Sequence, residues 1–77
     1  MDGKRFIADQ LVNVTELCDD VEMAEVLSQV DGYNIQGLVK AWYDLGHNIY
    51  VNMYTKGVEG MVAADMYIDA FIGAFKK

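Results

Sequence analysis

The segment from residue 59 to residue 77 constrains the fold most, because it is apolar around almost its whole circumference. Six of its residues recur at intervals of three and four, the repeat of one helix face: Met61, Ala64, Ile68, Phe71, Ile72 and Phe75. Five more cover most of the other side: Ala63, Met66, Tyr67, Ala70 and Ala74. Such a helix has to be covered on several sides, by its own chain or by a second copy. The sequence therefore predicts a helix at the centre of a small helical domain.

The side of this helix that faces away from the six-residue stripe predicts self-association. Its mostly small side chains let two backbones approach closely: Ala63, Met66, Ala70 and Ala74. A chain of 77 residues has little volume in which to build a core. Its single cysteine, Cys18, excludes an internal disulfide, which leaves oligomerisation as the ordinary way to stabilise the domain. We therefore expect a homodimer with these four residues at the interface.

Three earlier segments also repeat their apolar residues at the helical period. They cover residues 3–18, 19–31 and 34–55. Asp19 and Glu22 form a capping box at the start of the second segment, and Asn34 is the N-cap of the third. No proline interrupts the chain, and Gly46 is expected to bend the third helix. The predicted fold is therefore all-α, with residues 1–77 as one domain, either a four-helix bundle or an irregular helical array.

Two short segments also fit β-structure, which leaves an alternative fold open. Residues 48–55 are rich in β-branched and aromatic side chains, and residues 11–15 are the only candidate partner strand. Pairing them would give an α+β fold with a two-stranded element. The helical repeat continues through both segments and favours the all-α fold. In that fold we expect a core that contains the residues at the middle of the apolar stripes: Trp42, Leu45, Ile68 and Phe71.

The acidic residues are separated from the basic ones along the chain. The net charge is −6, and no lysine or arginine lies between Arg5 and Lys40. Seven carboxylates fall in that interval: Asp9, Glu16, Asp19, Asp20, Glu22, Glu25 and Asp31. This charge repels nucleic-acid phosphates and anionic membranes, so we expect neither as a direct ligand. It can instead steer a protein partner with a basic surface, as mimics of nucleic acids do.

Three tyrosines of the third segment are further candidates for partner binding. Tyr43, Tyr50 and Tyr54 lie away from the apolar seam of that helix. Tyrosine is enriched in protein interfaces because it combines apolar area with a polar end. The alternative is that these rings fill a small core and that only their hydroxyl groups reach water.

The sequence holds few residues that suit catalysis. Asp44 and His47 lie about one helical turn apart, as do Asp65 and Asp69, and these four are the candidate ligands of a metal-dependent hydrolase. Solvated side chains explain both pairs better. No phosphate-binding loop, Cys-x-x-Cys pair or nucleophile elbow occurs. We therefore expect no enzyme activity, no cofactor and no bound metal.

These observations favour a non-enzymatic interaction protein that binds and inhibits or regulates a basic, nucleic-acid-binding protein. In size and charge the chain resembles the small acidic single-domain proteins of phages and mobile elements, several of which inhibit host nucleic-acid machinery. No motif is specific for one family. The alternative is a structural subunit of helical homo-oligomers, whose acidic face only keeps it soluble. A single thiol, no export signal and no membrane-spanning run predict a cytoplasmic location.

Overall fold

The computed structural model describes residues 3–77, and these form helices but no strand. In chain order the elements are α1 (Gly3–Val14), the 3₁₀ turn η1 (Thr15–Leu17), α2 (Asp20–Leu27), α3 (Ile35–Ala41), the π-helical turn η2 (Trp42–Gly46), α4 (His47–Tyr54) and α5 (Val58–Gly73). Because α3, η2 and α4 follow one another without a break, they form one long helix. The all-α prediction is confirmed. Residues 11–15 and 48–54 are helical, so the alternative α+β pairing is wrong.

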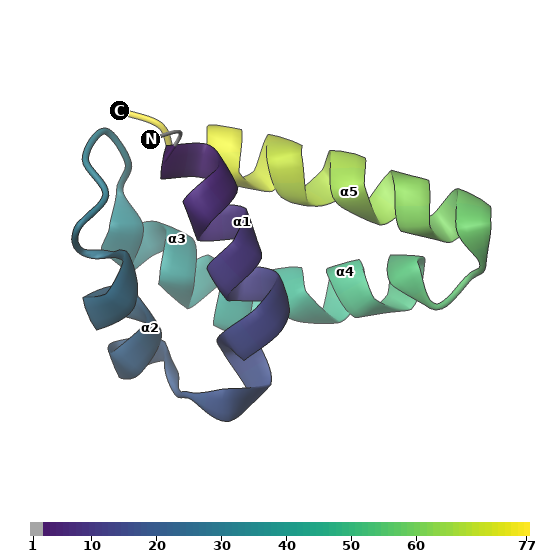
Figure 1. The fold of residues 1–77 in the computed structure, drawn as a ribbon, viewed down its shortest axis with the longest axis horizontal. Helices are drawn as coiled ribbons and strands as arrows, with labels where there is room; N and C mark the ends of the chain where they lie inside the picture. The colour runs from purple at the N-terminus through teal and green to yellow at the C-terminus, as the bar shows by residue number, and fades with distance from the viewer. Residues whose placement is uncertain (1–2) are drawn as a thin grey trace.

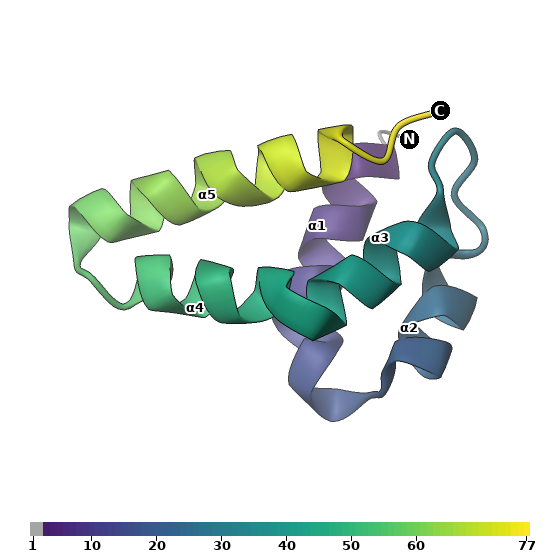
Figure 2. The same cartoon turned by 180° about the vertical axis from the view of Figure 1, so that it is seen from behind.

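The molecule has two distinct ends, with α1 crossing between them (Figure 1, Figure 2). At one end α4 and α5 form a hairpin, and at the other end α2 lies beside α3. The prediction of a central position for α5 is wrong, because α5 runs along an edge of the molecule. Gly57, with a φ of 88°, turns the chain back onto α4, and this leaves the outer side of α5 uncovered.

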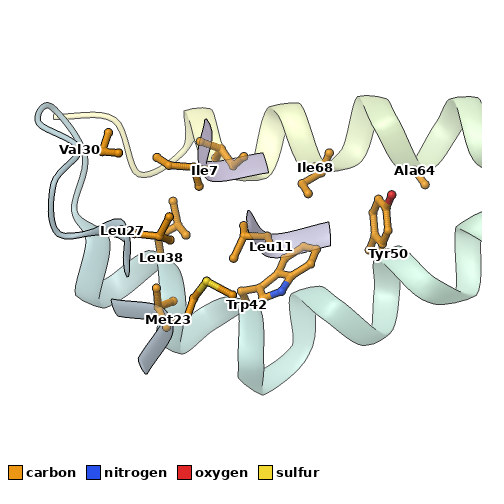
Figure 3. Close-up of a cluster of buried hydrophobic side chains, with 12 residues drawn as sticks. Ile7, Leu11, Met23, Leu27, Val30, Leu38, Trp42, Tyr50, Ala64 and Ile68 are labelled. Carbon is orange, nitrogen blue, oxygen red and sulfur yellow. The ribbon is translucent and has the colours of Figure 1, made fainter. Parts of the chain in front are cut away.

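The core surrounds Trp42, where α1 crosses the long helix (Figure 3). Its largest fully buried side chains are Trp42, Ile7, Leu11, Met23, Leu27, Leu38, Ile72 and Val39. The indole N–H of Trp42 donates to Thr15 Oγ1 at 2.9 Å, and the Thr15 hydroxyl donates to the Leu11 carbonyl oxygen. These two hydrogen bonds satisfy the buried polar groups at the junction of α1 and η1.

The core prediction is confirmed at two of its four positions. Trp42 is fully buried and Ile68 is nearly so. Phe71 is half-buried, with its ring centroid 5.5 Å from that of Trp42 in an edge-to-face arrangement.

The prediction that Leu45 lies in the core is wrong, because the long helix changes phase at η2. The His47 N–H bonds back to the Trp42 carbonyl oxygen, five residues earlier, so this turn contains an extra residue. Gly46 therefore faces inward, where an added Cβ would lie 3.0 Å from ring atoms of both Phe71 and Trp42. Leu45 is turned outward and is 60% exposed.

The predicted N-caps of the second and third helices are confirmed. The Asp19 carboxylate accepts the Glu22 N–H at 2.8 Å, and the Asn34 side-chain oxygen accepts the Gly37 N–H at 3.2 Å. α2 ends at Leu27, earlier than predicted, and residues 28–34 return the chain to α3. The end of the chain fastens this loop, because the backbone N–H of Asn34 donates to the Phe75 carbonyl oxygen at 2.8 Å.

Candidate interaction surface

The structure exposes all seven carboxylates of the acidic interval to solvent: Asp9, Glu16, Asp19, Asp20, Glu22, Glu25 and Asp31. Within residues 3–77, no ion pair within 4.0 Å joins Asp19, Asp20, Glu22, Glu25 or Asp31 to a lysine or arginine. The ion pair seen in this part of the chain joins Lys4 to Asp69, at 3.2 Å. Most of the acidic interval therefore presents negative charge that no close ion pair in this part of the chain neutralises.

Five of the seven carboxylates gather at one end of the molecule. Asp19 caps α2, three more lie on that helix, and Asp31 lies in the loop after it. Asp9 lies apart, on α1, in a hollow that it shares with Lys4 and Arg5. Glu16 lies in η1, beside α4. The structure thus brings most of the predicted acidic site to α2, and leaves Asp9 and Glu16 outside this group.

α2 and α3 are the walls of an open groove of about 1040 Å³. Apolar residues from both helices and from the loop between them line it: Val21, Ala24, Val30, Ile35 and Val39. Charged residues line it as well: Asp20, Glu25, Asp31 and Asp44 with a negative charge, Lys40 and Lys77 with a positive one. The groove therefore combines an apolar lining with an excess of carboxylates.

Sequence reasoning missed this groove because it followed charge along the chain and not between helices. Asp44 and Lys40 lie outside the acidic interval in sequence, yet α3 and η2 carry them to the same groove as Asp20. The available signal was the short loop between the end of the second predicted helix and the N-cap Asn34, which predicts neighbouring helices. It does not predict which faces of those helices meet.

The three candidate tyrosines differ in how much surface they offer. Tyr50 is 7% exposed and packs on Trp42, so it belongs to the core and cannot offer a partner much of its ring. Tyr43 is half-buried, and its hydroxyl donates to the Cys18 carbonyl oxygen at 2.9 Å. Tyr54 is exposed. Of the three rings, Tyr54 is therefore the one that is open to a partner.

The environment of Tyr43 favours the neutral phenol. Burial is the main cause that raises its pKa, followed by the hydrogen bond and charge interaction with Cys18 and by the charges of Asp19 and Asp20. The Tyr43 hydroxyl also lies 3.3 Å from the Thr15 carbonyl oxygen. This side chain thus fastens the η1–α2 junction to the long helix.

A second, smaller groove lies between α1 and α4, with a volume of about 410 Å³. Exposed apolar side chains line it: Val12, Leu17, Val51 and Tyr54. Glu16 and His47 line it too. It differs from the α2–α3 groove in having a single carboxylate.

The four residues predicted at an oligomer interface are all exposed: Ala63, Met66 and Ala70 on α5, and Ala74 directly after its last residue. Val58 and Val62 extend this uncovered apolar surface towards the start of the helix. The chain itself does not cover this side of α5, and self-association through it stays a prediction.

The candidate metal ligands lie on three elements: Asp44 in η2, His47 at the start of α4, and Asp65 and Asp69 on α5. Within residues 3–77, no three side chains of histidine, cysteine, aspartate or glutamate are grouped so that they could hold a metal ion.

Cys18 is half-buried, and its thiol donates to the Val14 carbonyl oxygen at 3.3 Å. None of the helices within residues 3–77 is long and apolar enough to cross a membrane.

The chain matches no protein-family model, no curated protein and no solved structure. The acidic α2 end, which gathers five exposed carboxylates beside an open groove, is the candidate site.

Proposed function

We propose that this protein is a non-enzymatic interaction protein that binds a partner with a basic surface and thereby inhibits or regulates it. The proposal is carried by the five exposed carboxylates that gather at the α2 end, none of which forms an ion pair with a lysine or arginine of residues 3–77. Exposed charges of one sign accelerate the encounter with a surface of opposite charge and disfavour partners of like charge. Apolar contacts are then needed to hold the complex after the encounter.

A nucleic-acid-binding protein is the class of partner that suits this surface best. Such proteins bind phosphates with clustered lysine and arginine residues. Four carboxylates lie between Asp19 and Glu25, about one charge every 2–3 Å along a helix axis. Duplex DNA carries one charge per about 1.7 Å. The charge densities are similar enough for the acidic end to occupy a surface that is built for phosphates.

The proposal is tested by capturing partners from a lysate of the encoding organism and then competing them off the immobilised protein with duplex DNA. We expect the captured protein to be basic, to be displaced by DNA, and to dissociate between about 0.1 M and 1 M salt, because the Debye length falls from about 10 Å to 3 Å. A specific partner that resists both DNA and 1 M salt would contradict the proposal.

A structural subunit is the second candidate function, and the uncovered side of α5 is the observation that favours it. Replacing Ala70, which is exposed on that side, by glutamate places a charge in such a contact without altering the buried face. If α5 mediates assembly, wild type sediments as a dimer and Ala70→Glu as a monomer at the same concentration. A wild type that is monomeric at high micromolar concentration removes this candidate.

A further inference from the structure

We infer that the groove between α2 and α3 binds a short helical segment of the partner, apolar on one side and rich in lysine or arginine along its edges. This inference rests on the proposed function, because it specifies which part of the acidic surface the partner enters. It also goes beyond that function, since attraction between charged surfaces requires neither a groove nor an apolar anchor.

The shape of the groove suits a helix. Val21 and Ala24 lie three residues apart on α2, and Ile35 and Val39 lie four residues apart on α3, so each pair belongs to one helix face. Two such faces side by side form a trough into which the side chains of a third helix can pack. α2 has eight residues and is about 12 Å long, so a segment of two to three turns is sufficient to span it.

The open shape of the groove favours a peptide over a small molecule. Pockets that enclose small ligands have volumes of about 300–1,000 Å³ and cover most of the ligand surface. This groove has a volume of about 1040 Å³ and is open to solvent. Val21 on its wall is 62% exposed, so an apolar side chain stands where an anchor residue of a partner can cover it.

The charges of the groove define the edges of the bound segment. Four carboxylates and two lysines line it: Asp20, Glu25, Asp31, Asp44, Lys40 and Lys77. The excess of carboxylates attracts basic side chains along the edges of the segment. The two lysines disfavour a segment that is basic on every side. The complementary partner is therefore amphipathic, with apolar residues facing Val21 and Ile35 and basic residues flanking them.

A pair of matched peptides tests this inference on the full-length protein. The first is a short leucine–lysine peptide whose leucines recur at intervals of three and four, and the second is a scrambled peptide of the same composition. Both carry the same charge, but only the first can present one apolar helix face. At about 0.1 M salt, fluorescence anisotropy is expected to show binding of the amphipathic peptide that is tighter by about tenfold or more.

Two valine substitutions in α2 provide the matched protein variants. Val21→Glu removes the apolar anchor but adds a negative charge. It should lower the affinity for the amphipathic peptide by about tenfold, while the scrambled peptide should bind at least as tightly as to wild type. Val26 is 40% exposed on the same helix and does not line the groove. Val26→Glu makes the same change of charge there, and it should alter both affinities by less than about twofold. Circular dichroism establishes that both variants are folded.

The outcomes separate this inference from the proposed function. If both peptides bind equally and lose affinity in salt, the groove inference is wrong while the acidic surface keeps its proposed role. If neither peptide binds at low salt, the groove inference and the proposed function are both wrong. Amide chemical shifts provide the location: the amphipathic peptide should perturb Ala24, Ile35 and Lys40. Perturbation confined to Leu17, Val51 and Tyr54 would place the peptide in the α1–α4 groove and overturn the inference.

Discussion

The two ends of the molecule are held together by different interactions. At the α2 end, side-chain hydrogen bonds connect the long helix to the η1–α2 junction: Trp42 donates to Thr15, and Tyr43 donates to the Cys18 carbonyl oxygen. At the hairpin end, α4 and α5 approach so closely that a Cβ on Gly60 would lie 2.1 Å from the Met53 carbonyl oxygen. The α2 end thus combines the buried side chains of Met23 and Leu27 with a few polar contacts, whereas the hairpin depends on close backbone packing.

The surfaces of the two ends differ in the same way. The α2 end exposes five carboxylates and an open groove, whereas the outer side of α5 exposes apolar residues such as Val58 and Met66. Charged groups act mainly on association rate and specificity, and apolar surface supplies most of the free energy of association. The comparison suggests that the α2 end serves an exchangeable partner, and that the hairpin is the candidate for contact with a second copy.

Removing Trp42 should have the largest effect, because both ends share the core around this residue. Trp42→Ala deletes a fully buried indole and leaves Thr15 without its donor, so we expect a loss of about 3–5 kcal/mol in the free energy of unfolding. Leu45→Ala is the matched control in the same π-helical turn, with an expected change of less than about 0.5 kcal/mol. Urea denaturation followed by circular dichroism measures both. Equal losses would show that η2 does not shift the phase of the helix.

Much of this fold follows from local sequence signals. The N-caps Asp19 and Asn34 and the helical repeat through residues 48–54 were predicted correctly, because each depends on residues within a few positions. The stripe of the last helix was correct in part: Ala64, Ile68 and Ile72 are buried, but Met61 is exposed. The position of Leu45 was predicted wrongly, because the π-helical turn places Gly46 against Phe71, a residue far along the chain. The same limit applies to the candidate site. Its charges were read from the sequence, but the groove depends on how α2 packs on α3.

Substitutions of two glycines in α5 test whether the hairpin depends on close packing. Gly60→Ala places a methyl group against the Met53 carbonyl oxygen, so α5 has to move away from α4 at a cost of about 1–3 kcal/mol. Gly73→Ala is the matched change near the end of the same helix. There the nearest atom within residues 3–77 is Lys4 Nζ, at 3.5 Å, and a gain of about 0.5 kcal/mol in the free energy of unfolding is expected. A Gly60→Ala variant as stable as Gly73→Ala would contradict the close approach.

A smaller effect is expected for Tyr43→Phe at the α2 end. Loss of the hydrogen bond to Cys18 should cost about 1 kcal/mol at neutral pH. Because the folded state raises the Tyr43 pKa, the stability that this group contributes is complete below about pH 10 and is lost as the pH rises further. The free energy of unfolding, measured between pH 8 and about 12, should therefore decline less steeply with pH in the Tyr43→Phe variant than in wild type. Some decline should remain, since burial also raises the pKa of Tyr50. If the free energy of unfolding declines with the same slope in both proteins, the titration of Tyr43 does not cause the loss of stability at high pH.

Charge reversal at each end, followed by association kinetics with the amphipathic leucine–lysine peptide, tests the central claim most directly. Glu22→Lys/Glu25→Lys changes the α2 end, and Glu59→Lys/Asp65→Lys makes the same change of net charge on α5. At about 0.1 M salt we expect the α2 variant to associate about tenfold more slowly and the α5 variant less than about twofold, with the difference disappearing near 1 M. Equal slowing of both variants, or of neither, would contradict the claim that the α2 end is the binding surface.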